Sequence, residues 1–430
     1  MPRSPVRRGS EGVLLKLAVI GGGSTYTPEL ADGLGRLAPQ VTEVVLVDPD
    51  EARLAVVGPV SARIMRAHGH QAVVRWTTDA ADGIDGAAAV LIQLRVGGQA
   101  ARGRDETWPG DFCCVGQETT GAGGLAKALR TIPLVLEIAE MARQRAAPGA
   151  WIIDFTNPGG MVTRALLDAG HRAVGLCSVA IGLQRYLASM LDVAPESVSL
   201  GHVGLNHLTW EREVRVDGVD RMPDLLAGHL KEIAEHVAAP PAVLSDSGVI
   251  PSYYLRYYYL HDSVVAEQRK AGTRAAAVAA IEAELLAMYA DPALDKKPEL
   301  LGQRGGAFYS EAAVALLASL IGDIGDVQVV NVRNDGTFGF LADEAVIEVP
   351  AVIGAGGAAP VPTAPLAPLL RGLVGHMSAY EELAVDAALR GGRTRVVSAL
   401  LAHPLIGQYD LAEKMADRLI AENASFLAWA

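Results

Sequence analysis

A strand-like run that ends in three glycines restricts the fold of this chain more than any other feature. Leu14–Ile20 is apolar except for Lys16, Gly21-Gly22-Gly23-Ser24-Thr25 follows it, and Thr27–Leu37 has a helical pattern. Residues without a β-carbon let a backbone turn approach a pyrophosphate, and the helix N-terminus offers free N–H groups to it. We therefore expect a strand, a turn and a helix that bind a dinucleotide.

Strands and helices continue to alternate after this turn. The β-branched run Thr42–Val47 ends at Asp48, the helical pattern Glu51–Ala67 follows, and further strand-like runs lie at Ala72–Thr77, Ala88–Leu94 and Trp151–Phe155. Such alternation predicts an α/β fold with a parallel, doubly wound sheet of the Rossmann type, as in lactate and malate dehydrogenases.

The acidic residue on the second strand supports a nucleotide site. Asp48 lies 27 positions after Gly21 and can accept hydrogen bonds from the ribose hydroxyls of NAD. Tyr26 occupies the place of the third glycine in the usual G-x-G-x-x-G, so the motif is imperfect. We expect NAD to bind at a set of six residues: Gly21, Gly22, Gly23, Ser24, Thr25 and Asp48.

The pattern changes character near residue 170, and we expect three regions. Residues 1–14 form a loose arm, 15–170 an NAD-binding domain, and 171–430 an α+β domain for substrate, metal and oligomerisation. Long helical patterns in the last region include Ala-rich and Leu-rich segments, at Pro223–Ala238, Arg274–Ala290, Ser310–Ile321, Leu369–Arg390 and Leu411–Ala424. Proline and alanine cluster at Gly354–Leu366, which predicts a surface connection.

Charge and cysteine content exclude several classes of protein. The net charge of −12 argues against nucleic-acid binding, which needs a basic face. The three cysteines are Cys113, Cys114 and Cys177, an odd number with two adjacent, which is a poor disulfide framework. No apolar run is long enough to span a bilayer and the N-terminus has no signal-peptide core. We expect a cytoplasmic protein with no membrane partner.

A cysteine and a histidine are candidate metal ligands. Cys177 ends the strand-like run that begins at Val174, and His207 lies 30 positions later in Gly204-Leu-Asn-His-Leu-Thr-Trp. A thiolate and an imidazole can hold a divalent cation whose remaining positions are open to substrate oxygens. From the residues alone, a cysteine that only packs and a histidine that is only hydrogen-bonded remain alternatives.

Candidate catalytic and substrate-binding residues follow other elements. Pro251–Leu260 holds five tyrosines, which indicates either an aromatic helix of the core or a tyrosinate base. Arg95 and Asn157 follow strand C-termini, where ligands collect in open α/β sheets, and Arg274 lies in a small turn. Arginines so placed suit phosphate or carboxylate, although a surface ion pair is the alternative.

Taken together these segments resemble glycoside hydrolase family 4, and within it the 6-phospho-β-glucosidases. The likeness covers nearly the whole chain in order. It rests on segments that begin at Val19, Leu94, Val115, Asp154, Gly175, Gly204, Tyr254, Gly272, Arg304, Asn331 and His403.

The resemblance implies a redox-assisted elimination in place of two-carboxylate hydrolysis. NAD takes hydride from C3 of the sugar, a tyrosine removes the C2 proton, the aglycone leaves, water adds and the hydride returns. Cys177 and His207 match the ligands of a metal, Mn2+ or another divalent cation, and Tyr254 best matches the base, with Tyr253 or Tyr257 as alternatives. Arg95, Asn157 and Arg274 match substrate-binding positions, with an arginine on the 6-phosphate. Members of the family are usually homodimers or homotetramers.

The residues after Cys177 depart from the family pattern. Members that act on α-glycosides carry aspartate after the cysteine, and β-acting members usually carry Asn-Val-Pro, but this chain has Ser178-Val179-Ala180. The missing carboxylate favours a phosphorylated β-glucoside as substrate. The alternatives are another specificity of the family (6-phospho-α-glucosidase, α-galactosidase or α-glucuronidase), an NAD-dependent 2-hydroxy acid dehydrogenase, and an NAD-binding sensor without activity.

Overall fold

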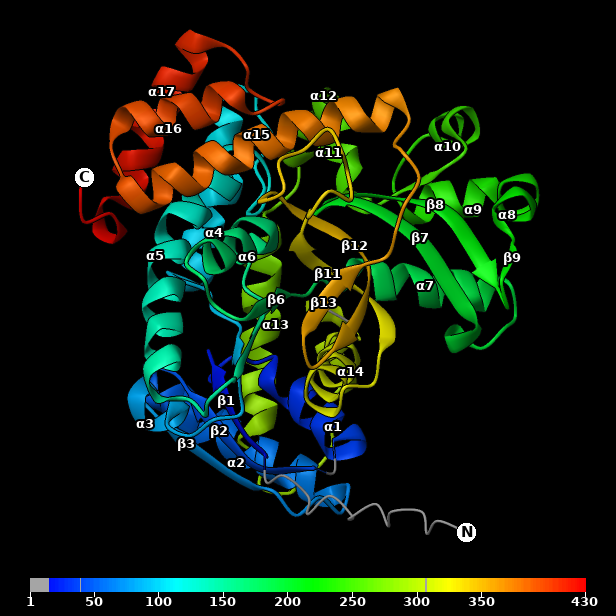
Figure 1. The fold of residues 1–430 in the computed structure, drawn as a ribbon. Coiled ribbons are helices and arrows are strands. Elements are labelled where there is room, and N and C mark those ends of the chain that lie inside the picture. Colours follow the sequence, from blue (N-terminus) through cyan, green and yellow to red (C-terminus); the bar gives the residue numbers. More distant parts are fainter. Residues whose placement is uncertain (1–14, 39, 306–307) are drawn as a thin grey trace, which may run out of the picture.

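The computed structural model describes residues 15–38, 40–305 and 308–430, and in this part of the chain two β-sheets are surrounded by helices (Figure 1). The expected loose arm, residues 1–14, lies outside the described residues. The larger sheet has nine strands in the order β13-β12-β11-β6-β5-β4-β1-β2-β3. The smaller sheet contains β10, β8 and β7, and β9 pairs with β8.

Six strands of the larger sheet are parallel and run in the order β3-β2-β1-β4-β5-β6, which is the order of the dinucleotide-binding fold. Helices cover both faces, so central strands such as β4 and β5 are buried along their whole length. The predicted Rossmann-type sheet is therefore confirmed. Its strands are β1 (Leu15–Ile20), β2 (Val41–Val47), β3 (Val73–Thr77), β4 (Ala89–Ile92), β5 (Trp151–Asp154) and β6 (Ala173–Gly175).

The helices of this half lie between the strands. They are α1 (Thr27–Leu37), α2 (Glu51–Ala67), α3 (Ala80–Ile84), α4 (Gly98–Thr107), α5 (Gly121–Arg145), α6 (Gly159–Asp168) and α7 (Val179–Met190). Helix α5 begins in the glycine-rich segment 121–124. Its first turn packs closely, since a β-carbon on Gly123 would lie 2.3 Å from the carbonyl oxygen of Gln117.

Three antiparallel strands from the C-terminal half extend the same sheet. They are β11 (Asp326–Arg333), β12 (Val346–Gly354) and β13 (Gly357–Pro360). Strand β11 pairs with β6 through Asn331 and Gly175, so the sheet continues past residue 170, and the division of the chain there stays a prediction. The predicted surface connection Gly354–Leu366 is wrong in part because β13 lies in it. An edge strand tolerates a proline such as Pro360 at its end.

The smaller sheet packs with α7 and three short helices around a separate apolar core. Its strands are β7 (Val198–Leu205), β8 (Leu208–Val216), β9 (Val219–Asp220) and β10 (Ile250–Pro251), and the helices are α8 (Met222–Gly228), α9 (Leu230–His236) and α10 (Pro241–Ser247). The single helix predicted at Pro223–Ala238 is wrong. His229 has φ −129° and ψ 17°, which ends α8 and starts α9.

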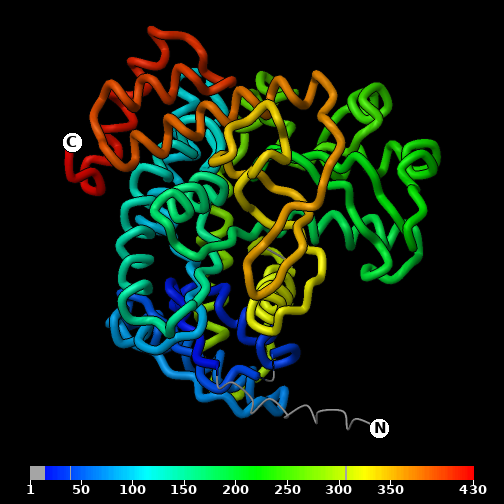
Figure 2. The backbone as a smooth tube through the Cα atoms, in the orientation of Figure 1, coloured from blue at the N-terminus to red at the C-terminus, as the bar shows by residue number. Residues whose placement is uncertain are grey.

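The remaining helices follow in the C-terminal half of the chain. Figure 2 shows α15, α16 and α17 in orange to red, and α15 packs on α5. These helices are α11 (Arg256–Tyr259), α12 (His261–Gln268), α13 (Arg274–Tyr289), α14 (Tyr309–Gly322), α15 (Pro368–Arg390), α16 (Arg393–Ala402) and α17 (Tyr409–Asn423). Short 3₁₀ turns lie at Trp108–Phe112, Pro195–Ser197, Tyr253–Leu255, Glu299–Arg304 and Ala424–Phe426. Among the described helices, none combines the length and the apolar character needed to cross a bilayer.

Candidate active site

A cavity of about 1280 Å³ opens at the carboxyl ends of the parallel strands. Residues that follow β1, β4, β5 and β6 line it, together with the β7–β8 turn and parts of α11 and α13. Ligands of open α/β sheets bind at this edge. The cavity brings together nine of the predicted site residues: Gly21, Ser24, Asp48, Arg95, Asn157, Cys177, His207, Tyr254 and Arg274.

The glycine turn is held by the second strand. The N–H groups of Gly21 and Gly22 donate to the carbonyl oxygen of Val47 at 2.8 and 2.9 Å. Gly21 has a φ of +85°, and a β-carbon there would lie 2.6 Å from the carbonyl oxygen of Gln93. Only glycine fits this position without strain, so the turn has the close approach of backbone that a pyrophosphate requires.

Asp48 is oriented by the backbone at the mouth of this turn. Its Oδ2 accepts from the N–H of Gly23 at 3.0 Å and its Oδ1 accepts from the N–H of Asp50 at 3.0 Å. Gly22, Gly23 and Thr25 do not line the cavity, and their part is to shape the turn. The Asp48 carboxylate is thus held in a fixed orientation by two backbone N–H groups.

An apolar wall beyond Asp48 was missed by the sequence reasoning. Leu134, Ile138 and Met141 lie one helical turn apart on α5 and line the cavity. Leu134 remains 37% exposed, which is unusual for leucine on a helix that packs in the core. The helical spacing of these three residues is visible in the sequence, but a helix that packs in the core and a helix that lines a ligand cavity have the same spacing.

The two predicted metal ligands line the same cavity although 30 positions separate them. Cys177 follows β6 by two residues, and His207 lies in the two-residue turn between β7 and β8 with a φ of +61°. Burial, and then the nearby Glu348 carboxylate, raises the pKa of the Cys177 thiol well above its usual value. Among the described residues there is no cluster of three or more metal-binding side chains. A thiolate and an imidazole fit a divalent cation with open positions.

Hydrogen bonds assign the tautomer of His207. Its Nδ1 lies 2.9 Å from the hydroxyl of Thr119, and that hydroxyl lies 2.8 Å from Oε1 of Gln117. Oε1 also accepts from the backbone N–H of Thr119, so it is the amide oxygen, and the hydroxyl must donate to it. Thr119 therefore accepts from an Nδ1–H group, and Nε2 of His207 keeps the lone pair that a cation needs.

Of the five tyrosines, Tyr254 stacks on His207 of this pair. Its ring stacks on the ring of His207 with centroids 3.7 Å apart and an angle of 8°. Burial raises the pKa of Tyr254 well above its usual value, and the neighbouring Cys177 adds to the rise. Tyr253 and Tyr257 line the cavity too, whereas Tyr258 and Tyr259 do not. Without a bound cation, Tyr254 is therefore a neutral phenol.

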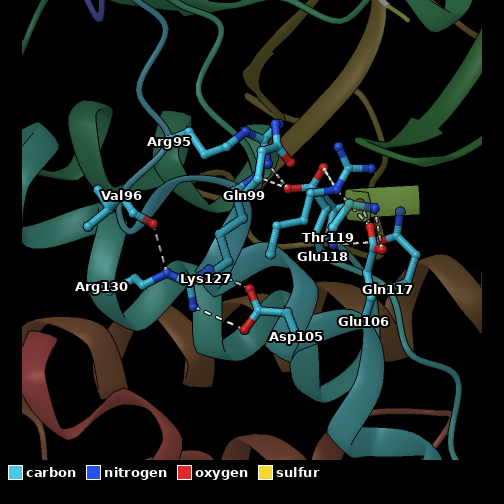
Figure 3. A network of polar contacts seen from close by, with 12 residues as sticks. Arg95, Val96, Gln99, Asp105, Glu106, Gln117, Glu118, Thr119, Lys127 and Arg130 are labelled. Atoms are coloured by element: carbon cyan, nitrogen blue, oxygen red, sulfur yellow. Dashed lines mark hydrogen bonds and ion pairs between the residues drawn. The ribbon is translucent and has the colours of Figure 1, made fainter. Parts of the chain in front are cut away.

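A buried carboxylate surrounded by cations forms part of the cavity floor, and Figure 3 shows it in close-up. Glu118 accepts from Lys127 Nζ at 2.6 Å, lies 3.2 Å from Arg102 Nε, and pairs with Arg95. Burial alone would raise the pKa of Glu118, but the three cations hold it well below its usual range. With Glu106, which pairs with Arg102 at 2.7 Å, the cluster carries three positive and two negative charges.

This cluster was missed because its members come from separate elements. The segment that begins at Val115 belongs to the family resemblance, but nothing in its sequence identifies Glu118 as the centre of three ion pairs. The net positive charge of the floor suits an anionic ligand. Arg95 is about a quarter exposed in its side chain, so it can contact such a ligand while it remains paired.

The other predicted substrate residues lie on the rim. Asn157 precedes α6, and Arg274 is the first residue of α13, with its Nη2 donating to the carbonyl oxygen of Gln303 at 2.7 Å. Arg304, which begins one of the segments of the family resemblance but was not predicted as a site residue, also lines the cavity and pairs with Glu282 at 2.9 Å.

Comparison with known proteins places this cavity in a family. The model of the family 4 glycosyl hydrolases matches residues 16–193, and the model of the family 4 glycosyl hydrolase C-terminal domain matches residues 202–406. The chain therefore belongs to the family 4 glycosyl hydrolases, as the sequence motifs predicted.

Individual relatives are similar over nearly their whole length. The probable 6-phospho-beta-glucosidase of Bacillus subtilis is 36% identical over 96% of this chain and 97% of its own. The structure of the 6-phospho-beta glucosidase from Thermotoga maritima with NAD and glucose-6-phosphate is 31% identical, with a TM-score of 0.91 over 96% of this chain and 99% of its own. A second structure of that enzyme contains manganese together with NAD+ and glucose-6-phosphate.

A lactate dehydrogenase from Cryptosporidium parvum shares the fold alone. It is 17% identical, with a TM-score of 0.55 over 88% of this chain and 99% of its own. This likeness confirms the expected relation between the sheet and that of the dehydrogenases.

Proposed function

We propose that this chain is an NAD- and divalent-metal-dependent 6-phospho-β-glucosidase. The observation that carries the proposal is that one cavity contains the glycine turn with Asp48, the Cys177 and His207 pair, and a positively charged floor. Relatives at 31–36% identity are named 6-phospho-beta-glucosidases, and structures of one contain NAD, manganese and glucose-6-phosphate.

Each part of the cavity has a task in the proposed reaction. The glycine turn and Asp48 hold NAD, and Cys177 and His207 hold the cation through Sγ and Nε2. When bound, these two groups accept and return a hydride at C3 of the sugar and polarise the C2 and C3 oxygens.

Tyr254 is the proposed base. Its ring contacts the imidazole of His207, so a cation beside that imidazole lowers the cost of forming the phenolate that removes the C2 proton. With C3 oxidised to a ketone, loss of that proton would let the C1–O bond break and the aglycone leave with a proton from solvent. Addition of water at C1 and of a proton at C2, followed by return of the hydride to C3, would then give the free sugar phosphate. Arg95, Asn157 and Arg274 hold the sugar, and the positive floor lies beside the 6-phosphate.

The residue after the metal-binding cysteine supports a β-glycoside as substrate. Ser178 lines the cavity at the start of α7 and carries no carboxylate that could protonate an α-linked leaving group. An α-specific member of the family is the second candidate, since Glu118 is a carboxylate in the same cavity. Its three cations keep it ionised, which makes it a poor proton donor.

Release of p-nitrophenol tests the proposal. The assay compares the 6-phospho-β-glucoside, its α-anomer and the unphosphorylated β-glucoside, each with and without NAD+ and Mn2+. We expect turnover of the phosphorylated β-glucoside alone, lost when either cofactor is omitted. Turnover without NAD+ would contradict the redox step, and turnover of the α-anomer would establish the second candidate.

A matched pair of variants tests the base. Tyr254→Phe should lower kcat by about 10²–10⁴-fold with NAD+ affinity unchanged, which is the usual contribution of a general base. Tyr253→Phe, at the neighbouring cavity tyrosine, should keep most of the activity. The reverse order would assign the proton transfer to Tyr253.

The proposal also covers the location, the oligomeric state and the partners of the protein. We propose a cytoplasmic homodimer or homotetramer that acts on small phosphorylated glucosides and binds neither nucleic acid nor membrane. The net charge of −12 supports the absence of a nucleic-acid partner.

A further inference from the structure

A fully buried charged triad lies behind the proposed metal site. His202 on β7 is sandwiched between two carboxylates, with Nδ1 2.6 Å from Glu211 Oε1 and Nε2 3.1 Å from Glu348 Oε1. All three side chains are at most 2% exposed. Glu211 lies on β8 and Glu348 on β12, so the triad joins the two sheets.

The charge state of the triad follows from its contacts. Burial alone would lower the pKa of His202, but Glu211 and Glu348 outweigh it and raise the pKa to about 10. Burial alone would raise the pKa of Glu348, but its contact with His202 lowers it. An imidazolium that donates through both nitrogens gives each carboxylate one charged hydrogen bond, and the three groups together carry one net negative charge at neutral pH. Oε2 of Glu211 has no hydrogen-bond partner among the described residues.

Asn206 connects this triad to the proposed metal ligands. Its Nδ2 donates to Oε2 of Glu348 at 2.7 Å, and its side chain also hydrogen-bonds to the Cys177 sulfur. Its Oδ1 packs on the first turn of α6, where a β-carbon on Gly159 would lie 3.1 Å away. Asn206 is thus held from one side and contacts the thiol from the other.

The same contact holds the turn that carries His207. Asn206 and His207 are the two residues of the β7–β8 turn, and His207 has a φ of +61°, which a residue with a side chain rarely adopts. Such strain persists only where neighbouring contacts fix the backbone. The hydrogen bond between Asn206 and Glu348 is one of the contacts that fix the backbone of this turn.

We propose that Glu348 is a positioning residue for the metal site, which it orders through the Asn206 amide and supports with the charge of the triad. The inference rests on the proposed function, because it assumes that Cys177 and His207 bind the cation. The net negative charge of the buried triad favours a cation at the neighbouring pair of proposed ligands. Hydrogen bonds to metal ligands typically change metal affinity by about 10–100-fold.

Three variants separate the hydrogen bond from the charge. Glu348→Gln removes one charge and leaves a single amide oxygen for two donors. Glu211→Gln removes the same charge from the triad but leaves the contact of Glu348 with Asn206 intact. Asn206→Ala breaks that contact at a half-buried residue, so it decides the question if Glu348→Gln does not fold. Glu213→Gln, at a half-buried position on β8 that pairs with Arg215 and does not contact the triad, is the unrelated control.

The readouts are the Mn2+ dissociation constant and the thiolate-to-metal absorption of the Co2+-loaded protein, each with NAD+ bound. We expect Glu348→Gln and Asn206→Ala to weaken Mn2+ binding by about 10–100-fold and to shift the Co2+ band. The NAD+ dissociation constant should stay within about twofold. Glu211→Gln should weaken Mn2+ binding less and leave the band in place.

Two results would overturn the inference alone. Unchanged Mn2+ affinity and Co2+ absorption in Glu348→Gln would remove Glu348 from the site. If Glu348→Gln and Glu211→Gln weakened Mn2+ binding equally and shifted the Co2+ band in neither protein, Glu348 would act through its charge alone and would not position the ligands. A wild-type protein without a Co2+ band, or a Cys177→Ser protein that keeps it, would instead refute the metal site of the proposed function, and the inference would fall with it.

Discussion

Asp154 offers a test of the electrostatics beneath the cavity. It is the last residue of β5 and fully buried; its Oδ1 accepts from the N–H of Thr156 at 2.9 Å, and its Oδ2 has no hydrogen-bond partner among the described residues. Gly175 is its neighbour on β6, and Asn331, also without partners for its amide, is the next neighbour on β11. Burial raises the pKa of Asp154 to about 8.

The sign and size of the effect follow from this shift. Between pH 4 and pH 8 the folded protein keeps a proton that the unfolded chain, with an aspartate pKa of 3.8, releases. The free energy of unfolding therefore falls as the pH rises through this window, by about 1.4 kcal/mol for each pH unit. From pH 5 to pH 7 the loss is about 2–3 kcal/mol. Asp154→Asn has no proton to lose, so its stability relative to wild type should rise by that amount.

Urea unfolding followed by tryptophan fluorescence at pH 5, 6 and 7 measures this difference. The change with pH is informative even if the amide packs worse than the carboxyl, because a packing cost does not depend on pH. Asp343→Asn, at an exposed aspartate, corrects for the loss of a charge as such. A constant difference between Asp154→Asn and wild type across the three pH values would refute the reasoning.

Three further predictions test the turn, the floor and the sheet. Asp48→Ala should weaken NAD+ binding about 10–100-fold in calorimetry, because a charged hydrogen-bond acceptor is lost. Lys127→Met should destabilise the protein by about 2 kcal/mol in thermal unfolding, since buried Glu118 loses one of its cations. Gly175→Ala should cost about 2–3 kcal/mol, since the new β-carbon would lie 2.0 Å from a threonine hydroxyl, whereas Gly182→Ala, in open space on α7, should stabilise by about 0.5–1 kcal/mol.

Each of these has a clear contrary result. NAD+ affinity unchanged in Asp48→Ala would separate the carboxylate from the nucleotide. A Lys127→Met protein as stable as wild type would mean that the remaining arginines suffice for Glu118. Equal melting temperatures for the two glycine variants would contradict the close packing at Gly175.

The sequence pattern predicted those parts of the site that follow directly on the strands of the parallel sheet. The glycine turn and Asp48 follow consecutive strands, and the carboxyl ends of parallel strands meet at one edge, so Arg95, Asn157 and Cys177 had to come together. His207 was connected to that edge by the hypothesis that it shares a cation with Cys177, which the residues alone left open, and Tyr254 was connected to it by the family resemblance. Nothing in their own segments reveals that the two rings stack.

The missed features depend on pairing between distant segments. Glu348 lies 142 positions from Asn206, and Glu118 gathers cations from three elements. One sequence shows the charges but not which of them share a buried site. The C-terminal strands were a similar case, because the periodicity of β11 and β12 fits any antiparallel pair and does not reveal that they extend the parallel sheet through β6.

The junction between β6 and β11 has a consequence for local unfolding. Only Gly175 and Asn331 pair across it among the described residues, so the hydrogen-bonded ladder of the nine-stranded sheet is thinnest there. Cys177 follows β6, and His207 is tied to β12 through Asn206 and Glu348, so the two ligands stand on opposite sides of β11. A cation bound by both Cys177 and His207 would link the two sides of the junction. Amide protons of Val174 and Val332 would then exchange with solvent more slowly once the cation is bound. Hydrogen exchange at these two residues would therefore report cation binding in the absence of substrate.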